Sequence, residues 1–384
     1  MRGFGRITPM VLATLAAMVC LRLRADEFND GIDRTDPKFV KASLMVASPG
    51  EELFSCVGHC FIRLECPTFK LDNCFSYESE APSSRLLTFF AGNLRQGLYA
   101  KTTADMLKEY EMDGRGVRQY ALNLAPAVKQ RLWKTMDECA AKNANLPYDY
   151  IARGCAKSVL DCLRAAVAPG VIEGRPLTIT QRETFNCELS ATHPWNLFIL
   201  NFIVGVETDT FVDVVTPRNL LAYLRAATIG GVPVIVGDGE EVLQRKLVVK
   251  PSWFSPLVFA CLLLALAAVG FAVKSRMIDW LFLSFQTALG SMLVYLSSAS
   301  ALPTACWNWL LVPFNPLPLV FWRGRRRWAL GFAALLVAWE AFMLFSPHAK
   351  TDPAYCVIAL AYIVFYIKVG LCKSALPSVK TIEE

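Results

Sequence analysis

The chain has 384 residues, of which 54% are hydrophobic and 19% carry a formal charge. A typical soluble domain has about 25% charged residues, so this composition favours a protein with membrane segments. The net charge of +6 is modest and is divided among short basic clusters, which argues against a nucleic-acid-binding surface. We therefore expect a membrane protein that has no nucleic-acid partner.

A short apolar segment follows a basic start at the N-terminus. Two arginines precede the apolar run 10–21, and two more follow it. About a dozen apolar residues suit a signal peptide better than a full membrane span. We expect residues 1–25 to be a cleaved signal peptide or an uncleaved anchor, and either one would place residue 26 onward outside the cytoplasm.

The charged middle of the chain, residues 26–250, contains both strand-like and helix-like patterns. In two segments the apolar side chains recur every three or four positions, which predicts amphipathic helices. Short apolar runs bounded by turn residues predict strands. The expected elements are strands at 42–47 and 60–64, helices at 126–143 and 155–166, and a hairpin within 232–248. This mixture predicts an α+β domain.

Five apolar segments follow and predict an all-α transmembrane domain over residues 251–384. Each has 18 to 23 residues, close to the roughly 20 needed to cross a bilayer. Basic loops follow the first, third and fifth segments, and the other two loops carry little charge. This alternation predicts a cytoplasmic C-terminus and an exported 26–250 domain. The expected spans are 254–273, 277–299, 305–322, 328–345 and 354–371.

One histidine and one cysteine of the exported part have settings typical of reactive residues. His59 follows Gly58 at the start of a predicted strand, where a tight turn leaves its ring accessible. Cys155 follows Gly154 at the start of a predicted helix, where unpaired amides and the helix dipole favour a thiolate. A histidine base beside such a thiol would form a cysteine nucleophile site.

The pattern alone leaves two other interpretations open. Cysteine is often a small core residue, and the exported part has eight of them, so one can begin a helix without being reactive. The spacing of Cys56, His59 and Cys60 also allows a zinc site, although a paired Cys-x2-Cys motif is missing. We expect neither a metal nor a cofactor.

An ordered set of short motifs resembles the Lnb N-terminal periplasmic domain family. The stretch 48–64, with the sequence SPGEELFSCVGHCFIRL, is similar to the opening motif of that family. The resemblance covers about residues 42–250, and the five-span tail is also the layout of the family. The further matches, in chain order, are Ser76-Tyr77, Gly114-Arg115, Gln119, 122–124, 147–150, Cys155, Pro194-Trp195, Gly205, Asp209 and 217–224.

This resemblance implies a permuted papain-like fold of the NlpC type, in which the histidine precedes the cysteine, followed by a five-helix transmembrane bundle. It implies lipoprotein N-acyltransfer in a bacterial inner membrane, with the catalytic domain in the periplasm. His59 matches the family histidine, and Cys155 matches the family cysteine. The implied partners are bacterial lipoproteins as acyl acceptors and a phospholipid or diacylglyceryl lipid as the acyl donor.

Other residues of these motifs are supporting candidates. Tyr77 could orient the site or pack in the core, and Arg115 could bind a phosphate or carboxylate or remain solvated. Ser55 and Glu52 of the opening motif are further candidates. Arg153-Gly154 replaces the Asp-Asn that usually precedes the family cysteine, so a side chain that could orient the site is lost.

Three functions are compatible with the sequence. The first is an acyltransferase in which Cys155 forms a thioester with the acyl chain and His59 acts as the base. The second is a periplasmic cysteine hydrolase that cuts a peptide or a cell-wall amide. The third is a non-catalytic membrane partner with a degenerate site, which Arg153-Gly154 keeps open. The predicted spans favour the first, because both of its substrates carry acyl chains held in the bilayer.

Overall fold

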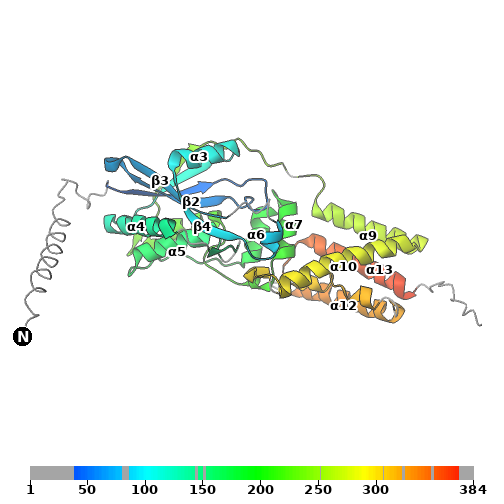
Figure 1. Cartoon of the computed structure of the whole chain (residues 1–384). Coiled ribbons are helices and arrows are strands. Elements are labelled where there is room, and N and C mark those ends of the chain that lie inside the picture. The colour runs from blue at the N-terminus through cyan, green and yellow to red at the C-terminus, as the bar shows by residue number, and fades with distance from the viewer. Residues whose placement is uncertain are drawn as a thin grey trace, which may run out of the picture.

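The computed structural model describes residues 39–79, 86–142, 146–149, 153–250, 252–305, 307–321, 325–346 and 350–371. The signal peptide or anchor expected at 1–25 lies outside these residues. The described chain forms a sheet covered by helices and, beside it, a bundle of long apolar helices (Figure 1). The α+β part and the helical part thus follow each other in the predicted order.

A seven-stranded antiparallel sheet forms the centre of the first part. Its strands lie in the order β6-β4-β3-β2-β1-β5-β9, so β1 and β2 are interior strands. The register pairs Ala47 of β1 with His59 of β2, which places His59 at the end of this central strand pair. The strands are β1 (Lys41–Ala47), β2 (His59–Cys66), β3 (Leu71–Ser79), β4 (Arg95–Thr102), β5 (Val117–Ala121), β6 (Leu146–Pro147) and β9 (Glu240–Leu243).

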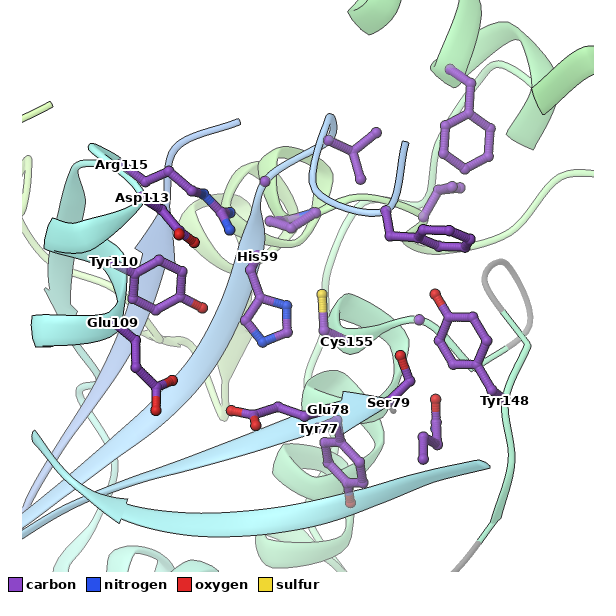
Figure 2. Close-up of a pocket in the computed structure, with 18 residues that line it drawn as sticks. His59, Tyr77, Glu78, Ser79, Glu109, Tyr110, Asp113, Arg115, Tyr148 and Cys155 are labelled. Carbon is purple, nitrogen blue, oxygen red and sulfur yellow. The ribbon is translucent and has the colours of Figure 1, made fainter. Parts of the chain in front are cut away.

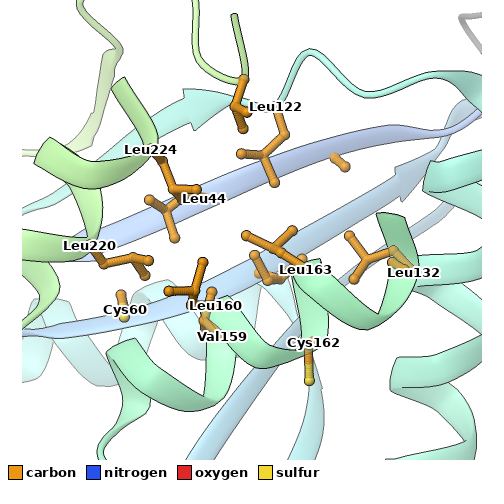
Figure 3. Packing of buried hydrophobic residues seen from close by; sticks show 14 of the residues in the cluster. Leu44, Cys60, Leu122, Leu132, Val159, Leu160, Cys162, Leu163, Leu220 and Leu224 are labelled. Atoms are coloured by element: carbon orange, nitrogen blue, oxygen red, sulfur yellow. The ribbon is translucent and has the colours of Figure 1, made fainter. Parts of the chain in front are cut away.

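Different helices cover the two faces of the sheet. Cys60 and Ile62 of β2 belong to a core shared with α4, α5 and α8, where Leu160 and Leu163 of α5 are fully buried (Figure 3). Phe61, one position out of phase, packs with α3 on the other face, because successive strand residues point to opposite faces. These helices are α3 (Thr103–Met112), α4 (Pro126–Lys142), α5 (Cys155–Val167) and α8 (Pro217–Ala226).

The strands predicted at 42–47 and 60–64 and the helices predicted at 126–143 and 155–166 are confirmed as β1, β2, α4 and α5. The hairpin expected within 232–248 is wrong. Gly230 and Gly231 both have positive φ and form the tight turn between β7 (Thr228–Ile229) and β8 (Val232–Pro233). β9 pairs instead with β5 in the large sheet. The glycines around Asp238 therefore redirect the chain from one sheet to another.

Helix α7 (Pro194–Ile203) joins the first part to the bundle. The Asn308 amide donates hydrogen bonds to the carbonyls of Phe202, at 2.8 Å, and Val204, at 2.9 Å. The Tyr355 hydroxyl donates to the Phe198 carbonyl at 2.7 Å, and these two rings stack. Satisfied polar contacts of this kind hold the two parts in one arrangement. The remaining helices of the first part are α2 (Leu86–Phe90) and α6 (Gln181–Leu189).

Four helices of the described residues are long and apolar enough to cross a membrane. Helix α13 is central, because it packs extensively against both α9 and α12. These helices correspond to the first, second, fourth and fifth predicted spans. Their bounds are α9 (Pro256–Val273), α10 (Arg276–Ser298), α12 (Arg325–Phe345) and α13 (Pro353–Leu371).

The third expected span, a helix at 305–322, is wrong. Its described residues form the end of η4 (Pro303–Ala305) and two further short helices, η5 (Trp309–Leu311) and α11 (Leu317–Val320). Pro313, Pro316 and Pro318 explain the break, because proline lacks an N–H donor and clashes with the preceding helical turn. Hydropathy alone cannot register this effect.

The broken segment nevertheless runs along the bundle from one end to the other. Asn308 binds α7 at the end nearest the sheet, and midway the Gln286 amide of α10 donates to the Pro313 carbonyl at 2.7 Å. At the far end, Phe321 stacks on Trp328 at 4.6 Å near Val369 of α13. Irregular backbone is tolerated at membrane depth when protein groups satisfy it in this way. The last two helices therefore keep the direction that five crossings would give them.

The basic loops and this course of the chain predict the membrane topology. Reporter fusions after Lys274 and after Arg327 should report cytoplasm, and a fusion at Lys350 should report periplasm. A cytoplasmic signal at Lys350 would contradict both the orientation and the crossing by the broken segment.

Candidate active site

His59 and Cys155 come together where β2 and α5 begin. The two side chains face each other in Figure 2, and both line a cavity of about 300 Å³. The packing of α5 against β2 produces this arrangement, because both residues stand at the first position of their elements. The pair singled out in the sequence is therefore adjacent in the fold.

The surroundings of Cys155 favour its thiolate. The hydrogen bond from the Cys60 thiol lowers the pKa of Cys155 most, burial opposes this effect, and the charge and hydrogen bond of His59 lower the pKa further. The net result is a Cys155 pKa well below its usual value. A thiol with a depressed pKa is more extensively ionised at neutral pH, as a cysteine nucleophile requires.

The sequence analysis named Cys60 only as a candidate ligand in the zinc interpretation, with no role beside the Cys155 thiol. It is fully buried in β2, and burial raises the pKa of its thiol well above the usual value. Cys60 therefore keeps its proton and donates it in the hydrogen bond to Cys155. Only the contact between β2 and α5 reveals this role.

Ser76 of β3 holds the His59 ring. Its hydroxyl lies 2.8 Å from Nε2 of His59 and is fully buried. Because Nε2 is engaged by Ser76, Nδ1 is the ring nitrogen left to face Cys155. An Nε2–H donated to Ser76 would leave Nδ1 unprotonated and able to act as a base. The sequence offered only the Ser76-Tyr77 motif match as a signal for this residue.

The N-terminus of α5 provides further polarity. Gly154 is its N-cap residue and makes no side-chain cap hydrogen bond. The first backbone amides of the helix are therefore available to an anion in the cavity. Such amides can stabilise the oxyanion that forms when a thiolate attacks a carbonyl.

Tyr77 and Arg115 line the same cavity. The Tyr77 hydroxyl, however, lies 3.1 Å from Sγ of Cys162, and the ring packs against the core, which matches the core alternative. Arg115 is 7% exposed, and its Nε donates to the Ser48 carbonyl at 2.8 Å. Its Nη2 atom has no hydrogen-bond partner among the described residues, so it can bind an acceptor in the cavity.

Ser55 and Glu52 do not line the cavity. The Ser55 hydroxyl donates to the Glu52 carbonyl at 3.2 Å, and Gly50 N–H donates to the Ser55 carbonyl at 2.9 Å. These bonds shape the turn that precedes His59. The structure therefore places both residues as supports of the loop.

Tyr148, which lies within the motif match at 147–150 and had no role assigned from the sequence, also lines the cavity. Figure 2 shows Cys155 between His59 and Tyr148. Burial raises the pKa of Tyr148 well above its usual value, so its hydroxyl remains a donor at neutral pH. Its ring also lies near those of Phe54 and Phe89, with centroids 6.4 and 6.5 Å away.

Metal ligation finds no support in the described part of the chain. No group of three or more histidine, cysteine, aspartate or glutamate side chains there could hold a metal ion. The Cys56 thiol donates to the Leu53 carbonyl at 3.0 Å, and Cys74 belongs to the core on the α3 face of the sheet. The cysteines of the described residues are all free thiols.

Residues 27–183 match the sequence model of a family described as the Lnb N-terminal periplasmic domain. The matched region includes both His59 and Cys155 and ends within α6, before the bundle begins. This match confirms the family resemblance over the motifs from 48–64 to Cys155, and the motifs from Pro194-Trp195 onward lie beyond the matched region. No curated protein and no solved structure matches the chain.

The hydrogen bond from Cys60 makes a prediction about reactivity. Cys60→Ala removes a donor that stabilises the thiolate, so the pKa of Cys155 should rise and its alkylation by iodoacetamide at neutral pH should slow. The rate should recover at higher pH, where the thiol ionises without help. Cys56→Ala, which alters a different buried cysteine, should leave the pH profile unchanged. An unchanged profile in Cys60→Ala would refute the proposed role of Cys60.

Proposed function

The chain carries an Lnb N-terminal periplasmic domain, and on this premise we propose that it is a membrane-anchored, cysteine-dependent lipoprotein N-acyltransferase. Cys155 would be the nucleophile and His59 the general base. The acceptor would be the α-amine of a lipoprotein's lipidated N-terminal cysteine. The donor would be an acyl ester of a phospholipid or of a diacylglyceryl group.

The observation that carries the proposal is that the cavity lined by the activated Cys155 thiol lies beside the helical bundle. Phe54 and Tyr148 line the cavity and also belong to an apolar cluster with Phe89. The same cluster includes Leu302 and, from α10, Leu296. In this proposal an acyl chain would follow the apolar surface of this packed cluster to Cys155, while its remainder stays among the membrane-spanning helices.

In this proposal, the catalytic cavity lies close to the bundle because moving an acyl chain out of the membrane costs free energy. Each methylene moved from an apolar environment into water costs about 0.8 kcal/mol. Withdrawing a whole acyl chain would therefore add a large barrier. A catalytic domain held on the bundle by α7 avoids this cost, because only the ester needs to reach the thiolate.

In the first half-reaction, the Cys155 thiolate would attack the donor's ester carbonyl. The carbonyl oxygen becomes an oxyanion, which the free amides of α5 and the unpaired Nη2 of Arg115 are suited to stabilise. The carbon–oxygen bond of the ester then breaks, and the departing alkoxide takes a proton from the imidazolium of His59. The products are a Cys155 thioester and an alcohol.

In the second half-reaction, the lipoprotein amine would attack the thioester carbonyl. His59 takes the proton that the amine releases, the carbon–sulfur bond breaks and the Cys155 thiolate is regenerated. The hydrogen bond between His59 Nε2 and Ser76 would keep the ring oriented through both transfers.

The Arg153-Gly154 pair is compatible with this reaction. The Arg153 side chain donates to the Pro147 carbonyl at 3.2 Å, and its own carbonyl accepts from the Gln96 amide at 3.1 Å. These bonds hold the loop before Cys155, while Ser76 orients His59. In this proposal Ser76, which the family motif also has, would orient His59 without a side chain at position 154.

The proposal predicts the loss of lipoprotein N-acylation in Cys155→Ala. Rates should fall by about 10⁴-fold or more, and His59→Ala should cause nearly the same loss, because residues that act as one unit are not additive. The measurement is mass spectrometry of a lipoprotein's N-terminal peptide, made in cells that lack other N-acyltransferases.

Cys187→Ala, which changes an exposed cysteine of α6, is the matched control and should retain activity. Fully triacylated lipoprotein at normal levels in Cys155→Ala cells would contradict the acyl-enzyme mechanism. Released fatty acid without lipoprotein acylation would instead indicate a hydrolase.

A further inference from the structure

We propose that a second site, a groove between α9, α12 and α13, binds a membrane glycerolipid that carries a free hydroxyl on its glycerol backbone. The groove is a cavity of about 920 Å³, within the range of roughly 300–1,000 Å³ typical of small-molecule sites. It exists because α9 and α12 both pack against α13 but barely touch each other. In Figure 1 these two helices lie on either side of α13.

The walls of the groove are apolar and open to the surroundings of the bundle. Leu257 of α9 is 47% exposed, and Leu344 of α12 is 78% exposed. Leu257 lies near the start of α9, Leu344 lies near the end of α12, and Pro353 begins α13. The groove therefore lies at the end of the bundle nearest the sheet, which the basic loops place in the outer leaflet.

Two oxygen atoms in this groove lack hydrogen-bond donors. Glu340 Oε1 and Thr351 Oγ1 are buried and have no partner among the described residues. Cys356 of α13 provides a hydrogen bond to the Glu340 carboxyl, so only part of that group is satisfied. A buried acceptor without a donor is costly, and an ionisable residue inside a membrane helix usually serves a ligand.

The position and charge of these oxygens select the occupant. Glu340 lies five residues before the end of α12, about 7.5 Å deeper at 1.5 Å per residue. Glu340 and the buried Asp352 bring two carboxyl groups to the groove, and the cation that lines it, Lys350, is paired with Glu183 at 3.5 Å, so the groove disfavours an anion beside Glu340. A glycerol hydroxyl supplies the missing donor, and its neighbouring acyl chain fits the apolar walls.

Helix α6 separates the groove from the Cys155 cavity. Phe185 lines that cavity, whereas Asn186, Cys187 and Ser190 line the groove. Hydroxyl-lipid binding therefore does not depend on the nucleophile. If the proposed function holds, acyl transfer from a glycerolipid leaves such a hydroxyl, and the groove would retain that co-product.

The test is native mass spectrometry of the full-length protein in detergent micelles with matched lipid probes. Dioleoylglycerol is compared with its O-methyl ether, and a lysophosphatidylethanolamine with its deoxy analogue, so that a neutral lipid and a lysophospholipid are distinguished. At least one hydroxyl lipid should be retained about fivefold better than its matched probe, as one added buried hydrogen bond implies. Equal retention within both pairs would overturn the proposal.

Variants assign the effect to the groove. Glu340→Met should abolish the hydroxyl preference, whereas Glu340→Gln keeps an acceptor oxygen and should retain it. Leu344→Trp should lower retention of every probe by filling the groove, and Leu335→Trp, at an exposed position of α12 outside it, should not. Cys155→Ala should bind as the unmodified chain does, so a failure of the acyltransferase proposal remains distinguishable. A preference that survives in Glu340→Met would refute the site.

Discussion

The packing of one face of α5 against β2 is the contact on which the site depends. Leu160 and Leu163 of α5 share a fully buried core with Ile62 of β2. This core brings the first residue of the helix to the first residues of the strand, so Cys155 meets both Cys60 and His59. Interior packing at native density allows little freedom in such a contact. Ordinary hydrophobic burial therefore sets the geometry that lowers the pKa of the thiol.

A second contact fixes the site relative to the bundle. The bonds from Asn308 and Tyr355 to the backbone of α7 are long-range and tie helices of the membrane part to the domain that carries the cavity. The apolar cluster around Phe54 and Phe89 fills the space between them. The proposed acyl transfer needs a constant height of the site above the membrane, and this junction would provide it. The Cys155 cavity and the groove beside Glu340 lie on opposite sides of α6, so the two proposed lipid sites are separate.

Local patterns predicted those elements in which local and tertiary preferences agree. The apolar stripes of 126–143 and 155–166 were sufficient for α4 and α5, because the stripe is also the face that the sheet buries. Hydropathy failed at 305–322, where prolines break the helix although the segment is apolar. The pairing of His59 with Cys155 came from their local settings and from the family resemblance. The roles of Ser76 and Cys60 were not predicted because they arise from strand neighbours and from the position of α5, which the local sequence does not encode.

The central claim is that Cys155 carries the acyl chain between donor and acceptor, and detection of that thioester tests it most directly. Full-length protein, incubated with a defined phospholipid in the absence of acceptor lipoprotein and then quenched in acid, would be analysed by peptide mass spectrometry. The account predicts one added acyl mass on the peptide that contains Cys155, which neutral hydroxylamine removes and which Cys155→Ala lacks. Lipoprotein N-acylation by protein whose Cys155 never bears an acyl group and stays fully alkylable would contradict it.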